Sequence, residues 1–299
     1  MKTGFIGIIG RPNVGKSTLL NAILGEKIAI TTDKPQTTRN TIRGIYTREE
    51  TDTDDGCQMI FLDTPGIHKP RTKLGNFMTD AAITTFKEVE VILFLVDGKI
   101  DKGPGDKYIL DLIKDIDTPK ILVINKIDKM EPDEFREIFE EYEAMDIFDG
   151  IFGTSAKEGR NVPQLLEKIE EFLEDGPQYF PSDMVTDHPE RFIVSEIIRE
   201  KVLLYLEDEV PHGVAIEIES YSEEPNITKI GAVIYCERKS HKGIIIGKQG
   251  KKLKGIGKSA RMEIEALVGT KVFLELWVKV KENWRDSDFA LSNFGSKDL

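Results

Sequence analysis

The sequence predicts an α/β domain with a doubly wound, mostly parallel sheet, followed by a smaller α+β domain. Four observations support this prediction. Short apolar runs alternate with amphipathic segments through the first half of the chain. A stretch with two prolines and a glycine interrupts that pattern at 175–183. The order after it is one helix, two strands, a helical region and a strand. The length of 299 residues is about that of two domains.

The strands predicted in the first half share a composition of β-branched and aliphatic residues. They are FIGIIG (5–10), QMIFLD (58–63), VILFLVD (91–97) and KILVINK (120–126). Because these runs are apolar on both faces, they suit a parallel sheet that helices cover on both sides. Amphipathic stretches at 16–24, 105–114 and 162–173 supply the helices. We place the first domain at 1–177 and a linker at 178–190.

The second domain is predicted at 191–299. It begins with an amphipathic helix at 191–206, and strand-like runs follow at 213–221 and 229–237. A last strand, KVFLELWVKV, is predicted at 271–280. We expect Trp277 in this strand to be a core residue, whereas the sequence leaves the role of Trp284 open.

Charge and composition limit the possible functions. The net charge of −12 argues weakly against a nucleic-acid partner, but residues 238–262 contain nine basic side chains and no acidic one. No apolar run approaches the roughly 20 residues that span a bilayer, and the N-terminus does not resemble a signal peptide. Cys57 and Cys236 are far apart in sequence, and we expect both to be ordinary thiols of a reducing cytoplasm.

The segment GRPNVGKS (10–17) matches the phosphate-loop pattern G-x-x-x-x-G-K-[ST] between a predicted strand and a predicted helix. Its backbone N–H groups and the start of the helix favour phosphate oxygens. We expect Lys16 to reach the β- and γ-phosphates and the Ser17 hydroxyl to bind Mg²⁺. The nucleotide contacts predicted here come from Gly10, Asn13, Val14, Gly15, Lys16, Ser17 and Thr18.

Three further motifs follow in order, each after an apolar run. DTPG (63–66) predicts that Asp63 binds Mg²⁺ through water and that the Gly66 N–H meets the γ-phosphate. In NKID (125–128), the carboxylate of Asp128 would be a buried charged acceptor. It can accept hydrogen bonds from both N–H donors of guanine, a pair that adenine lacks. In SAK (155–157), the Ala156 N–H can donate to guanine O6. The sequence therefore predicts a guanine nucleotide, bound in part by Asn125, Lys126, Asp128, Ser155, Ala156 and Lys157.

The polar segment TTDKPQTTRN (31–40) is the candidate first switch, in which one threonine would bind Mg²⁺ when the γ-phosphate is present. We favour Thr38 over Thr37, and expect Lys16, Thr38 and Gly66 to act on the γ-phosphate. Ile67 follows DTPG, where many regulatory GTPases have a water-orienting glutamine. One hypothesis is that K⁺, held by Asn13, assists instead; the alternative is that Asn13 only caps its own loop.

The basic region contains an apolar segment, G-x-x-G and a basic helix in IIIGKQGKK (244–252). The surrounding order is helix, strand, strand, short helix, G-x-x-G, helix and strand, which is typical of a type II KH domain. In such a domain the glycines allow close approach of RNA phosphates. The predicted RNA-binding residues are Gly247, Lys248, Gln249, Gly250, Lys251 and Lys252. The alternative is a solvated basic helix over an ordinary α+β core.

Together these motifs resemble the Era family of bacterial ribosome-assembly GTPases over nearly the whole chain. GRPNVGKS and NKID occur across a wider class, and the GKQG-bearing second domain is the specific feature. The resemblance implies GTP hydrolysis with Mg²⁺, binding near the 3′ end of 16S rRNA, and assistance to assembly of the 30S subunit. It also implies a monomer in the cytoplasm, with peripheral membrane association.

Two other functions remain open from the residues alone. One is an RNA-binding module whose nucleotide domain is static, and intact switch motifs argue against it. The other is a GTPase that modifies tRNA or moves ions, which the lack of further catalytic cysteines or membrane spans disfavours.

Overall fold

The computed structural model describes residues 1–32, 34, 37–51, 55–67, 83, 88–98, 104–206 and 213–286. The chain forms two compact units. The first contains Met1–Thr31 and most of the chain from Thr38 to Asp187. The second contains Thr32–Thr37 and the chain from His188 onward. Each unit has its own hydrophobic core and is described by itself.

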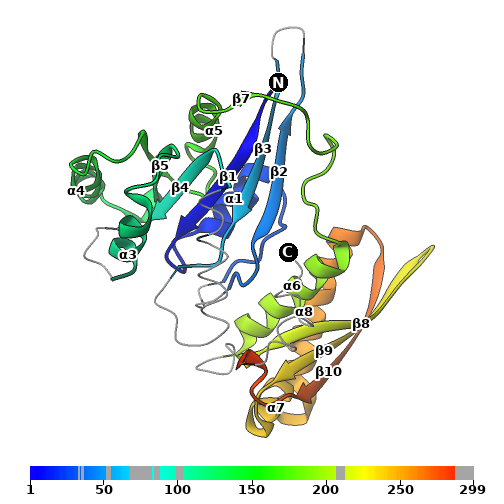
Figure 1. Ribbon diagram of the computed structural model, residues 1–299. Helices are drawn as coiled ribbons and strands as arrows, with labels where there is room; N and C mark the ends of the chain where they lie inside the picture. The colour runs from blue at the N-terminus through cyan, green and yellow to red at the C-terminus, as the bar shows by residue number, and fades with distance from the viewer. Residues whose placement is uncertain are drawn as a thin grey trace. The chain divides into compact units, whose positions relative to one another are not determined.

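The first unit is built on one sheet (Figure 1). Its strands are β1 (Lys2–Gly10), β2 (Ile42–Arg48), β3 (Cys57–Asp63), β4 (Val91–Val96), β5 (Lys120–Asn125), β6 (Gly150–Thr154) and β7 (Glu174–Asp175). The order is β2-β3-β1-β4-β5-β6, with β7 paired to β1. Among the described strands of this sheet, only β2 and β7 run antiparallel to their neighbours. The predicted α/β class with a mostly parallel sheet is confirmed.

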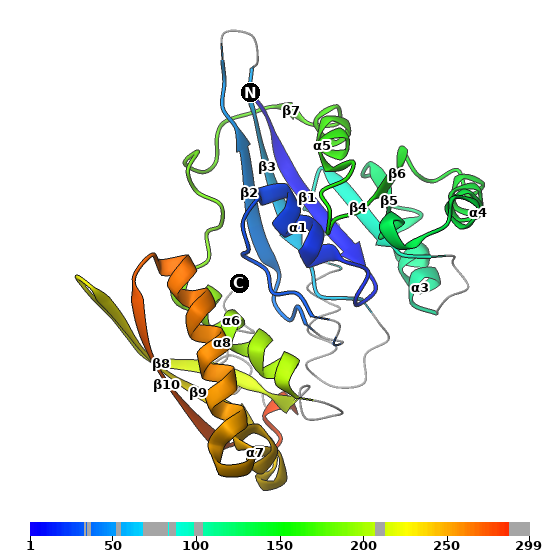
Figure 2. The same cartoon turned by 180° about the vertical axis from the view of Figure 1, so that it is seen from behind.

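Helices cover both faces of this sheet. The helices α1 (Lys16–Leu24) and α5 (Val162–Glu170) pack on one face, which the reverse view shows in front of the strands (Figure 2). The other face carries α3 (Pro104–Ile113) and α4 (Pro132–Glu143). Because both faces are covered, every residue of β4 and β5 is buried. This burial explains why these strands are continuous apolar runs in the sequence.

The second unit pairs three strands with helices on one face. Its elements are α6 (Glu190–Tyr205), β8 (Ala215–Glu224), β9 (Ile227–Cys236), α7 (Lys239–Ile246), α8 (Lys251–Val268) and β10 (Lys271–Val280). The sheet order is β10-β9-β8, with β10 parallel and β8 antiparallel to β9. Ile197 of α6, Ile256 of α8 and Ile234 of β9 are buried in the same hydrophobic core. The predicted smaller α+β domain is confirmed.

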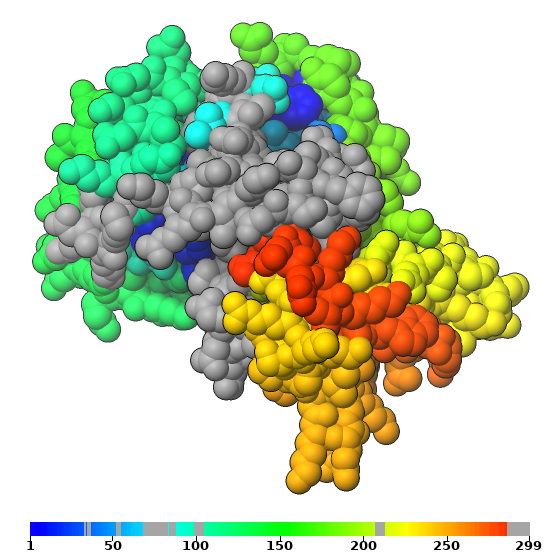
Figure 3. Space-filling model, turned by 60° about the horizontal axis from the view of Figure 1, so that its bottom comes forward, coloured from blue at the N-terminus to red at the C-terminus, as the bar shows by residue number. Residues whose placement is uncertain are grey.

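The expectation for Trp277 is wrong, because 44% of this residue is exposed. Along β10, Val272 and Val278 face the helices and are buried, so odd-numbered positions lie on the uncovered face of the sheet. The space-filling view shows β10 on the surface (Figure 3). Trp284 is instead buried, with 1% exposed, and its Nε1–H donates to the Gly213 carbonyl at 2.9 Å. It is a core residue.

The segment that we expected to be a linker contacts the first unit through its residues up to Asp187. The side-chain Oε1 of Gln58 on β3 accepts hydrogen bonds from the N–H groups of Tyr179 and Phe180 at 2.8 and 2.9 Å. Further along, Thr186 Oγ1 donates to the Arg43 carbonyl on β2 at 2.6 Å. Over the part of the chain that the structure describes, no helix combines the length and apolarity needed to cross a membrane.

Candidate nucleotide site and KH surface

The four predicted nucleotide motifs begin where strands of the first sheet end. The phosphate loop follows β1, DTPG follows β3, NKID follows β5 and SAK follows β6. These four strands are parallel, so their carboxyl ends meet at one edge of the sheet. The register pairs Asn125 with Thr154, which places the starts of the last two motifs side by side.

The phosphate loop is fixed by its own backbone and by Lys16. Lys16 Nζ donates to the carbonyl oxygens of Gly10 and Arg11 at 3.1 and 2.9 Å. Burial lowers the pKa of the Lys16 ammonium to about 8, although the charge of Asp63 raises it. Gly15 has φ 104°, and a Cβ there would lie 2.2 Å from Asn125 Nδ2. The loop can therefore approach the base motif only with glycine at this position.

The residues predicted to hold Mg²⁺ meet at one point. Ser17 Oγ donates to Asp63 Oδ2 at 2.6 Å and lies 2.9 Å from Thr38 Oγ1. Burial raises the pKa of the Asp63 carboxyl to about 6, although Lys16 and the two hydroxyls lower it. Asp63 Oδ1 is buried and has no hydrogen-bond partner among the described residues.

These oxygens fit a magnesium ion. Mg²⁺ is usually bound by one or two carboxylates together with phosphate oxygens and water. The described residues contain no cluster of three or more His, Cys, Asp or Glu that could hold a metal without such help. The unpartnered oxygen of Asp63 beside two hydroxyls is the arrangement that a cation shared with phosphate requires.

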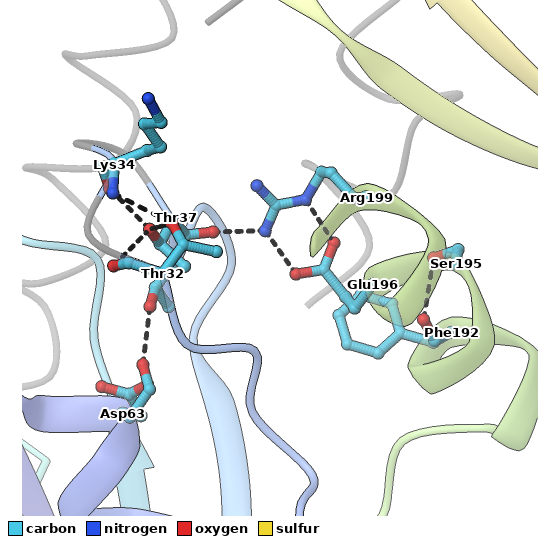
Figure 4. A network of polar contacts seen from close by, with 10 residues as sticks. Thr32, Lys34, Thr37, Asp63, Phe192, Ser195, Glu196 and Arg199 are labelled. Carbon is cyan, nitrogen blue, oxygen red and sulfur yellow. Dashed lines mark hydrogen bonds and ion pairs between the residues drawn. The ribbon is translucent and has the colours of Figure 1, made fainter. Parts of the chain in front are cut away.

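The two candidate threonines of the first switch have different hydrogen-bond partners. Thr37 Oγ1 donates to the Lys34 carbonyl at 2.6 Å and lies 2.7 Å from Thr32 Oγ1 (Figure 4). The Thr37 carbonyl accepts a hydrogen bond from Arg199 of α6, whose guanidinium also pairs with Glu196. The Thr37 hydroxyl is thus already engaged within its own loop, whereas that of Thr38 lies beside Ser17.

The residues around DTPG pack closely on the phosphate loop. A Cβ at Gly66 would lie 2.7 Å from the Pro12 backbone nitrogen, so the two loops touch. Ile67 is completely buried, and its N–H donates to the Gly10 carbonyl at 3.2 Å. A buried isoleucine cannot orient a water molecule. Asn13 is exposed at the loop surface with φ 67°.

The base motifs are joined by Asn125. Its Nδ2 donates to the Val14 carbonyl at 2.9 Å, and its Oδ1 accepts from the Ala156 N–H at 3.0 Å. Ser155 Oγ donates to Asp128 Oδ1 at 2.7 Å, and this bond lowers the pKa of the Asp128 carboxyl. Asp128 is exposed, whereas the sequence predicts a buried acceptor, so a base can reach its carboxylate from solvent. Lys157 is exposed beside this motif, and Thr18 lies half-buried in α1.

Three charged residues in or beside the phosphate loop were not predicted from the sequence. Arg11 forms ion pairs with Asp97, at 3.0 Å, and with Asp106 of α3, at 2.6 Å. Asp97 also pairs with Lys126 of NKID at 2.7 Å. Asp106 is completely buried, and its burial raises the pKa of its carboxyl although Arg11 opposes this. The one available signal was the position of Asp97 directly after an apolar strand.

The G-x-x-G segment of the second unit lies between α7 and α8. Gly247 and Gly250 have φ 72° and 73°, and a Cβ at Gly247 would lie 2.6 Å from that of Lys252. Lys248, Gln249 and Lys251 are exposed, and Lys252 is half-buried. Below them α8 buries an apolar stripe in the core, made of Ile256, Ala260 and Ile264. The helix is therefore anchored on one side and basic on the other.

Comparison with known proteins agrees with both units. Residues 5–126 match a family described as 50S ribosome-binding GTPase, and 209–285 match the KH domain family. GTPase Era of Alkaliphilus metalliredigens is 57% identical over 98% of both chains, and that of Clostridioides difficile is 56% identical over 99% of both. A structure of Aquifex aeolicus Era bound to GDP and AlF4⁻ has a TM-score of 0.93 at 40% identity. A structure of Era with MgGDPNP and nucleotides 1506–1542 of 16S ribosomal RNA has a TM-score of 0.92, also at 40% identity. Each structure and this chain cover 99% of one another.

The fold and the site thus define a P-loop GTPase joined to a KH domain. More particularly, the chain belongs to the Era family of GTPases, since it matches GTPase Era over nearly its full length.

Proposed function

We propose that this GTPase binds and hydrolyses GTP at the carboxyl edge of its first sheet, binds the 3′ region of 16S rRNA through its KH unit, and assists assembly of the 30S subunit. The meeting of Ser17, Thr38 and Asp63 is the observation that carries the nucleotide half. The positive-φ glycines of G-x-x-G before a basic helix support the RNA half, as does the relative bound to nucleotides 1506–1542.

The residues of the loops would act on the γ-phosphate in defined ways. Water attacks the phosphorus in line with the leaving oxygen, and negative charge grows on the phosphoryl oxygens. Lys16 and the loop N–H groups donate to these oxygens, and the Gly66 N–H donates to the γ-phosphate. Ser17 and Thr38, with Asp63 through water, would hold Mg²⁺, which when bound neutralises charge on the phosphates. Once the γ-phosphate leaves, the Gly66 N–H loses its acceptor, and Thr38 loses the Mg²⁺ contact that requires the γ-phosphate. Both switches then relax.

Base recognition is proposed at Asp128 and its neighbours. The exposed carboxylate accepts the guanine N1–H and exocyclic amine, and Ser155 keeps it ionised and oriented. The Ala156 N–H now bonds Asn125, and it would donate to guanine O6 when the base is present. Asn125, Lys126 and Lys157 complete the contact around the base. Adenine lacks this pair of N–H donors, so the site excludes it.

RNA binding is proposed at Gly247–Lys252. In KH domains the glycine loop clamps about four nucleotides through their backbone. The positive φ of both glycines lets the backbone bring phosphates close, and exposed Lys248 and Lys251 attract them. Ile244, which is 42% exposed, supplies apolar surface for a base.

Fluorescence anisotropy would test this function. The full chain is titrated onto a short single strand copied from the 3′ end of 16S rRNA, with GDPNP and then with GDP. We expect tight binding that differs between the nucleotides, and its loss in Gly247→Asp/Gly250→Asp. The matched control is Lys229→Glu on β9, which makes the same change in net charge on an exposed side chain that pairs with Glu224. Equal binding by both variants, or none by the wild type, would refute the RNA target.

We also propose that K⁺ bound by Asn13 assists hydrolysis. The support is the exposed amide in the phosphate loop together with an Ile67 that cannot orient water. Hydrolysis should be faster in K⁺ than in Na⁺, and Asn13→Ala should remove the difference. Equal wild-type rates in the two salts would contradict the proposal.

The working state that we propose is a cytoplasmic monomer with a fraction at the membrane surface. Its two cysteines are buried thiols outside any disulfide, as suits a reducing compartment. Light scattering of the purified chain would test the monomer. Cell fractionation in low and high salt would test the membrane fraction, which is refuted if none of the protein sediments with membranes at low salt.

A further inference from the structure

Asp97 lies between the two loops that would grip opposite ends of the nucleotide. It is the first residue after β4, and β4 lies between β1, which leads into the phosphate loop, and β5, which leads into NKID. The register pairs Gly10 with Leu95 and Val96 with Ile124. Asp97 is therefore level with the start of both loops.

The carboxylate of Asp97 uses each oxygen for a different loop. Oδ1 accepts from Arg11 Nη2 of the phosphate loop at 3.0 Å. Oδ2 accepts from Lys126 Nζ of the base motif at 2.7 Å. Lys126 Nζ also donates to the Asn13 carbonyl at 2.5 Å. Bonds between charged groups are stronger than neutral ones, so this one side chain joins the two loops.

The two partners of Asp97, Lys126 and Arg11, are held in position by contacts with neighbouring residues. Lys126 has φ 65°, a conformation that residues with a Cβ disfavour. Its backbone therefore keeps this shape because surrounding contacts hold it. Arg11 is fixed on its other side by the buried Asp106, and a Cβ on Gly105 would lie 2.7 Å from the Arg11 side chain. Asp97 thus connects Lys126 to an arginine that is itself immobilised.

We propose that Asp97 is a positioning residue for guanine-nucleotide binding: it holds the phosphate loop and the base motif at a fixed separation, so that base and phosphates are gripped together. This role rests on the proposed assignment of both loops to the nucleotide. Without the carboxylate, each loop moves independently, and the nucleotide leaves when either one opens. The consequences are faster release and weaker discrimination at the base.

The test compares Asp97→Asn with a matched control, Glu170→Gln. Glu170 also pairs two oxygens with an arginine, Arg48, at 2.7 and 2.8 Å. Its side chain is 22% exposed, against 23% for Asp97, and it lies on α5, outside the motifs. Release of a fluorescent GDP is followed by stopped flow after adding excess GDP. We expect release to be about tenfold faster in Asp97→Asn, and within about twofold of wild type in the control.

A second readout separates positioning from general weakening of the fold. IDP lacks the exocyclic amine that Asp128 would read, so it should leave the wild-type site faster than GDP. If Asp97 positions the base motif, the ratio of the two release rates should fall severalfold in Asp97→Asn. A fold that is merely destabilised would speed both releases by the same factor and keep the ratio.

Release of GDP by Asp97→Asn at the wild-type rate, or an unchanged ratio, would overturn the role of Asp97. If Asp97→Asn does not fold, Asp97→Glu keeps the charge but shifts the carboxylate by one methylene. It should still speed release severalfold, and a wild-type rate there would also overturn the proposal. Lys16→Ala tests the assignment of the site itself. If that variant binds nucleotide normally, the proposed site is wrong, independently of Asp97.

Discussion

Nucleotide binding should draw protons from solution at mildly alkaline pH, and the group that takes them up is Lys16. Its burial against the phosphate loop lowers the pKa of its ammonium from 10.5 to about 8. Without nucleotide, the folded protein therefore loses this proton near pH 8, whereas the unfolded chain keeps it to higher pH. A bound phosphate supplies the opposite charge and restores the ordinary pKa or a higher one. Binding above pH 7 is thus linked to proton uptake by Lys16.

The size of the effect follows from that pKa. At pH 8 about half of the nucleotide-free molecules lack the proton, so binding should take up about half a proton per nucleotide. At pH 7 the uptake should fall to about a tenth of a proton. Between pH 7 and pH 9 the affinity should weaken about tenfold from this group alone. Asp63, with a pKa of about 6, is already ionised across this range and adds little.

Isothermal titration calorimetry measures this uptake directly. GDP is titrated at pH 8 in two buffers with different ionisation enthalpies, and the difference in heat gives the number of protons exchanged. The uptake should vanish in Lys16→Arg, because a guanidinium stays charged throughout this range. Binding without proton exchange at pH 8 in the wild-type protein would refute the role assigned to Lys16.

Three further predictions follow from the two units. Asp128→Asn should weaken GDP binding by about a hundredfold or more, because an amide cannot accept both guanine donors. The same variant should bind XDP better in a competition assay. Unchanged GDP affinity would contradict the base site. Trp284→Ala should cost about 3–5 kcal/mol of KH-unit stability in chemical denaturation, because a buried indole and its bond to Gly213 are lost. Trp277→Ala should cost about 1–2 kcal/mol, since this side chain is already half in water; equal losses would refute the distinction.

The nucleotide motifs could be located from sequence because the physics is local. Each motif follows an apolar run, and parallel strands bring their carboxyl ends to one edge whatever their order. Thr38 could be only favoured over Thr37, because the choice depends on which hydroxyl the loop turns toward Ser17. That direction is set by contacts of Thr37 with Thr32 and Lys34, and neighbouring threonines have no sequence feature that reveals it.

The ion pairs of Asp97 needed the strand order, which periodicity does not give. Only because β4 inserts between β1 and β5 does its terminal aspartate face both Arg11 and Lys126. The two tryptophans differ in another way. The alternation along β10 already indicates that Trp277 shares a face with Glu275 and Lys279, so its exposure was predictable. The burial of Trp284 depends on Gly213, which is distant in sequence, so it was not predictable from the local pattern.

The burial of both cysteines makes the molecule convenient for site-directed labelling. The whole chain has only Cys57 and Cys236, and each is completely buried. Burial also raises the pKa of the Cys236 thiol, which leaves less of the reactive thiolate. A maleimide dye should therefore react first with a cysteine introduced at an exposed position, without removal of the native ones. A pair of such cysteines, at Glu158 in the first unit and Lys229 in the second, would let energy transfer report the distance between the two units in solution, nucleotide by nucleotide.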